Sequence, residues 1–329
     1  MAFHADVLSA IGRTPLVKLG KVVPAGAATV LVKLEYMNPG GSIKDRMAIH
    51  ILEKAEKSGL LRKGGTIVEN TSGNTGVGLA VAAAVKGYRC IFTIPDKMSK
   101  EKQDTLKAFG AQVVVTPTNV PADSPESYYS VAKRIAAETP NSFYVNQYHS
   151  ADNVEAHYQL TAPEIWEQTG GRIDAFVAAS GTGGTVAGVS EYLKSRRAAI
   201  RTVLADPPGS ALYEYIRHGV VKATGAGSIT EGIGIGRVTA NMQDAPIDDA
   251  VHVEDSETVT HVYRLLREEG LFVSSTSGIN VAAAVRVARE LGPGHTIVTV
   301  LCDTGSKYLS RLFNRDWLRQ KGLLQYACP

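Results

Sequence analysis

Lys44 occupies an unusual position for a lysine. It follows the turn sequence NPGGS at 38–42, and the apolar residues within 43–55 recur with helical spacing, so Lys44 falls in the first turn of an amphipathic helix. The N-terminus of a helix favours anions over cations. An amine presented there, directly after a glycine turn, is suited to forming a Schiff base with a carbonyl cofactor. An ordinary first-turn lysine with Asp45 and Arg46 as local partners is the alternative interpretation.

A glycine-rich loop, SGTGGT, covers residues 180–185 and precedes a run of helix-forming residues. Its backbone N–H groups and two threonine hydroxyls would lie at a helix N-terminus, an arrangement that suits a phosphate monoester. The loop lacks the lysine of a nucleotide-binding P-loop and the acidic partner of a dinucleotide fingerprint. Nucleotide binding, and with it a nucleotide-dependent oxidoreductase, is therefore disfavoured. A plain tight turn between a strand and a helix is the alternative.

A second glycine-rich loop, TSGNTG, covers residues 71–76 and has Asn74 at its centre. Its hydroxyls and N–H groups could hold a carboxylate, and Asn74 could donate to a phenolic oxygen of a cofactor, although a capped helix entry would look the same. Two anion-binding loops and a misplaced lysine together match pyridoxal 5′-phosphate chemistry. That chemistry needs a phosphate-bearing aldehyde that is held by its phosphate, linked to a lysine and presented to an amino-acid carboxylate.

Each glycine-rich loop joins a strand-like segment to a helix-like one. Before the two loops strands are predicted at 66–70 and 174–179, and after them helices at 77–85 and 186–194. Three further strands are each followed by a predicted helix: 89–94 by 99–109, 202–205 by 211–218, and 296–301 by a short helix from Ser306. This alternation predicts an α/β fold of parallel sheets, in which ligands bind beyond the carboxyl ends of the strands. The glycine loops are accordingly expected to share one cleft.

Composition excludes several classes of protein. A chain of 329 residues forms one large α/β domain or two domains, and its net charge of +3 (35 − 32) argues against a nucleic-acid-binding or disordered chain. Its three cysteines, Cys90, Cys302 and Cys328, have neither zinc-site nor disulfide-framework spacing, which favours a reducing cytoplasm. The apolar stretches are too short for a membrane span. We therefore expect a cytoplasmic protein with no nucleic-acid or membrane partner.

Two groups of polar residues receive plain interpretations. His149 and His157 stand eight residues apart without an acidic cluster, so no metal site is predicted. Four lysines are interpreted as one solvated helix face: Lys97, Lys100, Lys102 and Lys107.

Seven motifs occur in an order that is specific as a set. They are IGRTPLVKL at 11–19, NPGGSIKDR at 38–46, TSGNTG, NQY at 146–148, SGTGGT, EGIGIGRV at 231–238 and LCDTGSKYLS at 301–310. With them the chain resembles, over almost its whole length, the fold-type II pyridoxal-phosphate enzymes of the cysteine synthase and cystathionine β-synthase group. The resemblance implies a tryptophan synthase β-like architecture of two open parallel-sheet subdomains with helices on both faces. Residues 1–44 and 151–329 would form the larger, cofactor-binding subdomain, and 45–150 a smaller, mobile one.

The resemblance also implies a role for each motif. Lys44 would bind pyridoxal 5′-phosphate and move protons at Cα, Asn74 would donate to the 3′ oxygen, and the Thr304 hydroxyl would meet the pyridine nitrogen. The implied phosphate loop is Gly181, Thr182, Gly183, Gly184 and Thr185. The implied substrate-binding residues are Thr71, Ser72, Gly73, Asn74, Thr75 and Gln147, with Gly232 on a loop, 232–234, that faces the cofactor.

The implied reaction is β-replacement on an activated L-serine through an aminoacrylate. O-acetylserine or O-phosphoserine with sulfide would give L-cysteine. Segments such as 95–119 resemble cystathionine β-synthases, whereas EGIGIGRV and LCDTGSKYLS resemble cysteine synthases. The alternatives are therefore cystathionine formation from serine and homocysteine, C–N coupling of an amino-acid amine, and an inactive paralogue that binds a partner. The family also implies a homodimer.

Overall fold

The computed structural model describes residues 3–223 and 227–327, so Cys328 lies outside the described residues. The chain divides into two compact units. Unit 1 comprises Met1–Gly12 and Asn38–Asn153, and unit 2 comprises Arg13–Met37 and Val154–Pro329. This division assigns the first twelve residues and the turn before Lys44 to unit 1, whereas the family resemblance implies the larger subdomain for them. Each unit has its own sheet and is described separately.

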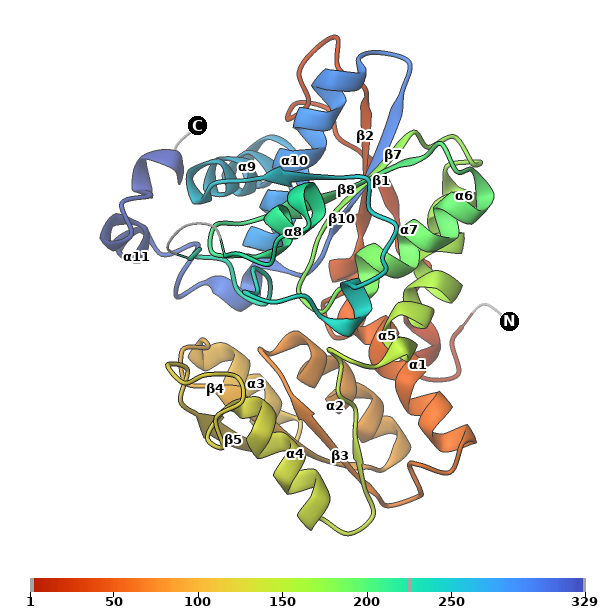
Figure 1. Ribbon diagram of the computed structural model, residues 1–329, viewed down its shortest axis with the longest axis vertical. Helices are drawn as coiled ribbons and strands as arrows, with labels where there is room; N and C mark the ends of the chain where they lie inside the picture. The colour runs from red at the N-terminus through yellow and green to blue at the C-terminus, as the bar shows by residue number, and fades with distance from the viewer. Residues whose placement is uncertain (1–2, 224–226, 328–329) are drawn as a thin grey trace. The chain divides into compact units, whose positions relative to one another are not determined.

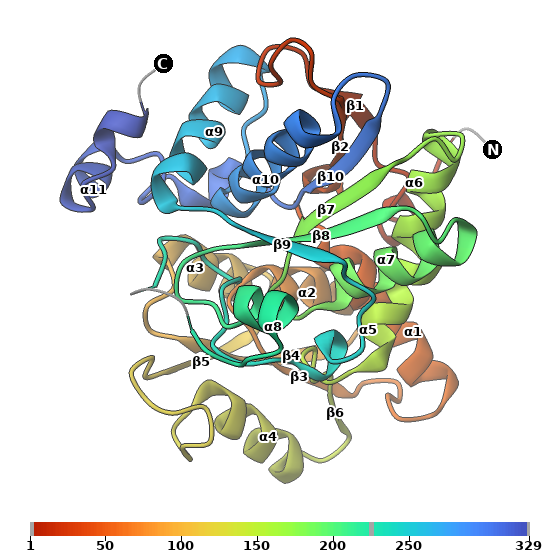
Figure 2. The ribbon, with the colours of Figure 1, turned by 45° about the horizontal axis from the view of Figure 1, so that its top comes forward.

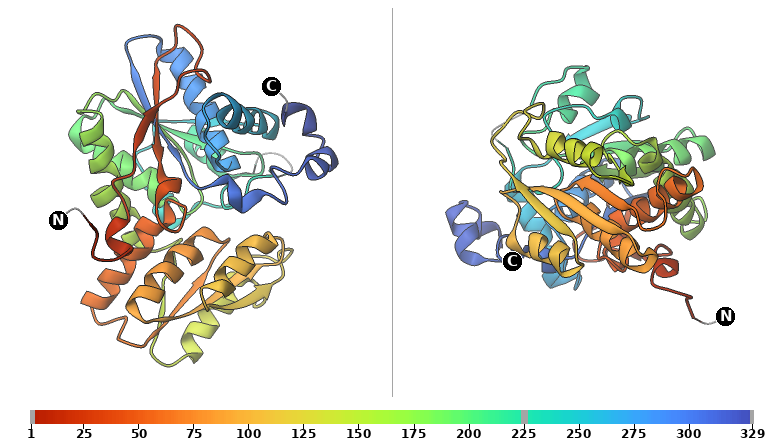
Figure 3. Two further views of the ribbon diagram at one scale, coloured as in Figure 1. Left: turned by 180° about the vertical axis from the view of Figure 1, so that it is seen from behind. Right: turned by 90° about the horizontal axis from the view of Figure 1, so that it is seen from below.

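Unit 1 is built on a four-stranded sheet in the order β5-β4-β3-β6, in which every neighbouring pair is parallel. The strands are β3 (Thr66–Asn70), β4 (Arg89–Pro95), β5 (Gln112–Thr116) and β6 (Ser142–Tyr144). The helices are α1 (Lys44–Lys57), α2 (Asn74–Lys86), α3 (Lys100–Ala108), α4 (Tyr128–Glu138) and α5 (Ala151–Ala156), which runs on into unit 2. Helix α4 covers one face of the sheet and α2 and α3 the other, with α1 packed on α2 (Figures 2 and 3).

Unit 2 is built on a six-stranded sheet in the order β1-β2-β10-β7-β8-β9 (Figures 1 and 2). The strands are β1 (Leu16–Lys18), β2 (Thr29–Leu34), β7 (Ala175–Ala179), β8 (Arg201–Asp206), β9 (Asp249–His252) and β10 (Thr296–Leu301). Only the β1–β2 pair is antiparallel among these strands, so the described sheet is parallel apart from its β1 edge. The α-helices are α6 (Ala162–Gln168), α7 (Gly184–Arg196), α8 (Leu212–His218), α9 (Asp255–Glu268), α10 (Ser275–Leu291) and α11 (Arg315–Gln320).

The core of unit 2 lies between its sheet and α10. This helix is buried along nearly its whole length, because β2, β7, β8 and β10 contact it on one side and α9 packs on the other. Short helical turns complete the unit at Glu35–Met37, Ala240–Met242, Gly305–Tyr308 and Leu324–Ala327; in unit 1 a 3₁₀ turn covers Leu8–Ala10. The helix that contains α5 and α6 is interrupted by a π-helical turn at His157–Thr161.

The predicted strand–loop–helix units are confirmed, and the described segments form an α/β fold with two largely parallel sheets. Two helices begin earlier than predicted, at Asn74 and Gly184 instead of residues 77 and 186. In both cases the last residues of the glycine loop form the first helical turn. The glycines are accommodated there because close packing, not intrinsic propensity, stabilises these turns.

Candidate active site

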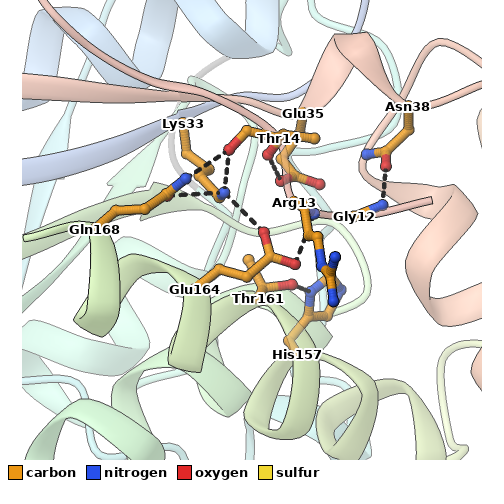
Figure 4. Close-up of polar contacts among 10 residues, drawn as sticks. All are labelled: Gly12, Arg13, Thr14, Lys33, Glu35, Asn38, His157, Thr161, Glu164 and Gln168. Carbon is orange, nitrogen blue, oxygen red and sulfur yellow. Dashed lines mark hydrogen bonds and ion pairs between the residues drawn. The ribbon is translucent and has the colours of Figure 1, made fainter. Parts of the chain in front are cut away.

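Lys44 begins helix α1, as predicted, and the preceding turn is held by local hydrogen bonds. The Gly41 N–H donates to the Asn38 carbonyl (2.7 Å), the Gly12 N–H donates to Asn38 Oδ1 (2.8 Å, Figure 4), and Gly40 N–H donates to the buried Asp45 carboxylate. A Cβ on Gly40 would lie 2.5 Å from Asp45 Oδ1, so only glycine fits beside this carboxylate. The turn thus has a specified shape, and the half-buried Lys44 side chain leaves the helix from a fixed backbone position.

Helix packing brings Lys44 to the same end of unit 1 as the TSGNTG loop. A Cβ on Gly78, in the second turn of α2, would lie 3.1 Å from the Lys44 carbonyl oxygen and 3.1 Å from Ala48 Cβ. Because Gly78 has no side chain, the first turn of α1 rests directly on the start of α2, one turn beyond Asn74. Two predicted cofactor-binding residues, Lys44 and Asn74, therefore come from the adjoining N-terminal ends of two packed helices.

The TSGNTG loop is shaped by Thr71 and by a buried lysine. Thr71 Oγ1 accepts the N–H groups of Gly73 (2.9 Å) and Gly76 (3.2 Å), and Gly73 has a φ of +132°, which strongly favours glycine. A Cβ on Gly73 would lie 2.8 Å from Cδ of Lys102. Lys102 is only 5% exposed, so its placement on a solvated helix face is wrong: the lysine stem covers the loop.

Gln147 joins the TSGNTG loop from the turn that follows β6. The Thr75 hydroxyl donates to Gln147 Oε1 at 2.7 Å, and both side chains are buried. Two residues that were predicted to bind the substrate carboxylate are thus in direct contact, although 72 positions separate them in the chain. Unit 1 thereby brings together Lys44, the 71–75 loop and Gln147.

Unit 2 positions the SGTGGT loop between β7 and α7. A Cβ on Gly181 would lie 2.1 Å from the Gly232 carbonyl oxygen, so these two predicted site residues are in close backbone contact. Gly183 has a φ of +94°, and a Cβ there would lie 2.6 Å from Met242. The Thr182 carbonyl accepts the Thr239 hydroxyl at 2.9 Å. Neighbouring backbone and side-chain atoms therefore pack directly against the loop, at a distance that only glycine permits at positions 181 and 183.

Thr185 is held by a histidine that sequence reasoning assigned to no site. His157 is fully buried in the π-helical turn, its Nε2 lies 3.1 Å from Thr185 Oγ1, and its Nδ1 lies 2.9 Å from Thr161 Oγ1 (Figure 4 shows the second contact). A neutral imidazole satisfies this pattern by donating from one nitrogen and accepting at the other. A π-helical turn in the interior of a helix often marks a functional site. In the sequence, the spacing of His157 from His149 was considered only for a metal site, so nothing there indicated a contact with Thr185.

A buried polar cluster anchors the helix that follows His157 (Figure 4). The Lys33 ammonium, on β2, donates to Glu164 Oε2 (2.8 Å) and Gln168 Oε1 (2.9 Å) of α6 and to the Thr14 carbonyl. Lys33 is fully buried, and its ion pair with Glu164 offsets part of the cost of burying an ammonium. The cluster ties α6, and with it the π-helical turn, to the edge region of the sheet.

Thr304 lies in the turn after β10, and Asn280 links the end of β10 to the end of β7, which precedes the SGTGGT loop. Thr304 Oγ1 accepts the Ser306 N–H at 3.3 Å and so caps the Gly305–Tyr308 turn. From α10, Asn280 Oδ1 accepts the Ala179 N–H (2.7 Å) and Nδ2 donates to the Val300 carbonyl (2.8 Å). Asn280 thus cross-links the carboxyl ends of β7 and β10. Unit 2 brings together the 180–185 loop, Gly232 and the strand end that leads to Thr304.

The structure offers no evident metal site or membrane segment in its described part. Among residues 3–223 and 227–327 no three His, Cys, Asp or Glu side chains are grouped to hold a metal ion. In the same residues no helix is both long and apolar enough to cross a bilayer.

The chain is similar over most of its length to known proteins. A family model described as "Pyridoxal-phosphate dependent enzyme" matches residues 7–303. The chain is 45% identical to cysteine synthase 1 of Emericella nidulans over 98% of this chain and 88% of the relative. It is 42% identical to cystathionine beta-synthase of Mus musculus over 97% of this chain but only 57% of the relative. Among solved structures, an O-acetylserine dependent cystathionine beta-synthase from Helicobacter pylori matches with a TM-score of 0.86, 34% identity, and coverage of 94% and 99% of the two chains.

Proposed function

Because this chain belongs to the family of pyridoxal-phosphate dependent enzymes, we propose that it replaces the β substituent of an activated L-serine with sulfide to give L-cysteine. The activated serine would be O-acetylserine or O-phosphoserine. The observation that carries the proposal is the placement of Lys44, whose helix turn packs directly on the start of α2 beside Asn74 and the loop 71–75. Similarity to a fungal cysteine synthase over nearly the whole chain supports sulfide as the nucleophile.

The SGTGGT loop fits the phosphate of the cofactor. Helix α7 begins at Gly184 without a side-chain cap, and among the described side chains the buried Ser180 Oγ has no hydrogen-bond partner. Uncapped N–H groups and a buried hydroxyl at the start of a thirteen-residue helix suit a doubly charged phosphate. We therefore propose that Gly181, Thr182, Gly183, Gly184 and Thr185 hold the phosphate. The Thr304 hydroxyl would contact the ring nitrogen, and Asn74 would donate a hydrogen bond to the 3′ oxygen.

Lys44 would perform the proton transfers. When bound, pyridoxal phosphate supplies the electron sink that acidifies the substrate Cα–H bond. The Lys44 amine would bind the aldehyde carbon in the resting enzyme, remove the Cα proton after the substrate amine takes its place, and return that proton once the nucleophile has added at Cβ. Its fixed exit from the N-terminus of α1 keeps the amine in one region throughout, which favours reuse of a single base.

The loop 71–75 and Gln147 would receive the substrate carboxylate. The first-turn N–H groups of α2 have no partners within the helix and point toward the helix N-terminus, where the dipole favours an anion. Ser72 and Gly73 precede this turn, and Thr71 shapes it. Gly232 would add a backbone contact on the cofactor side. The smaller subdomain that carries these residues is proposed to move over the substrate and exclude water.

A second candidate is cystathionine formation from serine and homocysteine. It is favoured by the similarity to cystathionine beta-synthase of Mus musculus and to the O-acetylserine dependent cystathionine beta-synthase of Helicobacter pylori. The same residues would act in both reactions, which differ in the leaving group and in the nucleophile that enters. Only a direct comparison of nucleophiles separates them.

The test is a nucleophile panel on the purified holoenzyme. The protein is mixed with O-acetylserine, O-phosphoserine or serine, and then with sulfide, homocysteine or an amino-acid amine, while product is quantified by mass spectrometry. We expect L-cysteine from sulfide at a rate at least tenfold above the other products, and loss of both activity and bound-cofactor absorbance in Lys44→Ala. A colourless wild type would contradict the cofactor role of Lys44. A pigmented wild type that is inactive in every combination would indicate the inactive paralogue.

We also propose that the enzyme is a cytoplasmic homodimer. Val7 and Val17, which are 42% and 37% exposed, each present apolar surface near the N-terminus, and neither described cysteine is in a disulfide. Light scattering at micromolar concentration tests the dimer, and cell fractionation tests the compartment. A monomeric mass, or a protein found outside the cytoplasm, would overturn the corresponding part.

A further inference from the structure

Glu69 is a carboxyl buried where the fold has no need of a charge. It is fully buried in β3, a strand whose five residues are all buried and which lies between β4 and β6. No lysine or arginine within the described part of the chain forms an ion pair with it. Burying an unpaired carboxyl is costly, whereas an apolar residue at this position would stabilise the sheet. The group therefore invites a functional explanation.

The Glu69 carboxyl accepts two hydrogen bonds from Gln147, alongside backbone N–H groups of Asn146 and Asn70. Gln147 Nε2 donates to Glu69 Oε1 at 3.1 Å, and the Gln147 backbone N–H donates to Glu69 Oε2 at 3.4 Å. Both oxygens of the carboxyl thus contact a single residue in the turn after β6. Because β3 and β6 are neighbouring parallel strands, this contact joins the carboxyl ends of the two strands.

Gln147 transmits this contact to the TSGNTG loop. Its Nε2 also donates to the Asn70 carbonyl (2.9 Å), a pure acceptor, which leaves Oε1 to accept the Thr75 hydroxyl (2.7 Å). The Gln147 carbonyl accepts Asn153 Nδ2 at 2.9 Å, so the backbone of the turn is held as well. With both Nε2 hydrogens donated inside unit 1, the amide orients Thr75. Thr75 lies in the first turn of α2.

We propose that Glu69 is a positioning residue: through Gln147 and Thr75 it holds the first turn of α2 in the geometry that receives the carboxylate of the amino-acid substrate. The inference rests on the proposed function of the 71–75 loop. It assigns Glu69 no contact with the substrate or the cofactor. It accounts for the buried carboxyl, because an acceptor that binds both the side-chain and backbone N–H groups of one residue specifies the amide's position in a way that an apolar residue cannot.

The test measures amino-acid binding, which does not depend on turnover. Wild-type holoenzyme, Glu69→Gln and Glu69→Ala are titrated with L-alanine, which has no leaving group, and binding is followed by the visible absorption of the bound cofactor. The titrations are made at pH 9, where the Glu69 carboxyl is ionised, so that Glu69→Gln keeps one acceptor but places an amide N–H₂ against a Gln147 donor. We expect the dissociation constant to rise about tenfold in Glu69→Gln and further in Glu69→Ala, with unchanged cofactor content. The matched control is Glu53→Gln, at an exposed position of α1 in the same unit.

A second comparison separates positioning from a merely structural role. In a Gln147→Ala background the connection to Thr75 is absent, so Glu69→Gln should have no further effect on the dissociation constant. The same tenfold loss in both backgrounds, or an unchanged dissociation constant together with a lower Tm, would overturn the inference. A wild-type enzyme that binds L-alanine but forms no product with any nucleophile would refute the proposed reaction. The binding comparison would still test the role of Glu69 in that case.

Discussion

Nε2 of His157 lies 3.1 Å from the hydroxyl of Thr185, in the loop that we propose binds phosphate. His157 lies at a π-helical turn whose following helix is anchored by the buried Lys33 cluster. A threonine that can hydrogen-bond a phosphate is thus oriented by an imidazole that is itself fixed on its other side by Thr161.

The first prediction concerns this pair. His157→Phe replaces the imidazole with a larger planar ring that has no nitrogen, so the Thr185 hydroxyl loses this hydrogen bond. We expect the dissociation constant for pyridoxal phosphate to rise about tenfold, measured by titrating the cofactor into resolved enzyme, since one hydrogen bond to a charged group contributes about 1.5–3 kcal/mol. His149→Phe, at an exposed position, is the control. Equal cofactor affinity in wild type and His157→Phe would contradict a role for His157.

The second prediction concerns Gly181. A Cβ there would lie 2.1 Å from the Gly232 carbonyl oxygen, a backbone atom that cannot move away without displacing its loop. Gly181→Ala should therefore lose most of its bound cofactor and absorb weakly in the visible range. Gly236→Ala is the matched control, because a Cβ at Gly236 meets nothing within 4 Å and its φ lies outside the left-handed region. Normal cofactor content in Gly181→Ala would refute the close contact.

The third prediction concerns the pH dependence of stability. Burial raises the pKa of Glu69 to about 8 from an ordinary 4.5, against the opposing effect of the Gln147 hydrogen bonds. Between these two pH values the folded chain keeps a proton that the unfolded chain releases. The free energy of unfolding therefore falls as the pH rises from about 4.5 to 8, by at most about 1.4 kcal/mol per pH unit, and is constant above that range. Glu69→Gln lacks this penalty.

The measurement is the Tm of wild type and Glu69→Gln from pH 5 to pH 9. The difference between the two values should move in favour of the variant up to about pH 8 and stay constant above it. A difference independent of pH across this range would show that Glu69 ionises at its ordinary pKa.

The fourth prediction concerns Lys102, whose stem lies against Gly73. Lys102→Ala removes that packing and should raise KM for O-acetylserine several-fold with a smaller change in kcat, because the loop that receives the carboxylate is less ordered. Lys100→Ala is the control, because the Lys100 side chain is 85% exposed and forms a surface ion pair with Asp104. Equal KM values for the two variants would argue against a role for Lys102 in the loop.

Much of the fold could be predicted from the sequence because its signals are local. The strands at 66–70 and 296–301 are short runs rich in β-branched residues next to glycine-containing turns, and the Ala-rich run after the first of them is typical of a helix. Lys44 could be placed at the start of α1 for the same reason. The α-helix starts at Asn74 and Gly184 were predicted two or three residues late, since a glycine in a first turn carries no helical signal of its own.

The sequence by itself determined the family, the two glycine-rich loops and the lysine, since these depend on residue type and order along the chain. Only the tertiary structure showed that His157 supports Thr185, that Glu69 reaches Thr75 through Gln147, and that Lys102 covers Gly73 instead of facing solvent. These partners are separated by 28 to 78 positions, or lie on helices whose exposed and buried faces look alike in sequence. A hydrogen bond between residues far apart in the sequence depends on the tertiary fold that brings the two atoms together, and no local sequence pattern predicts it.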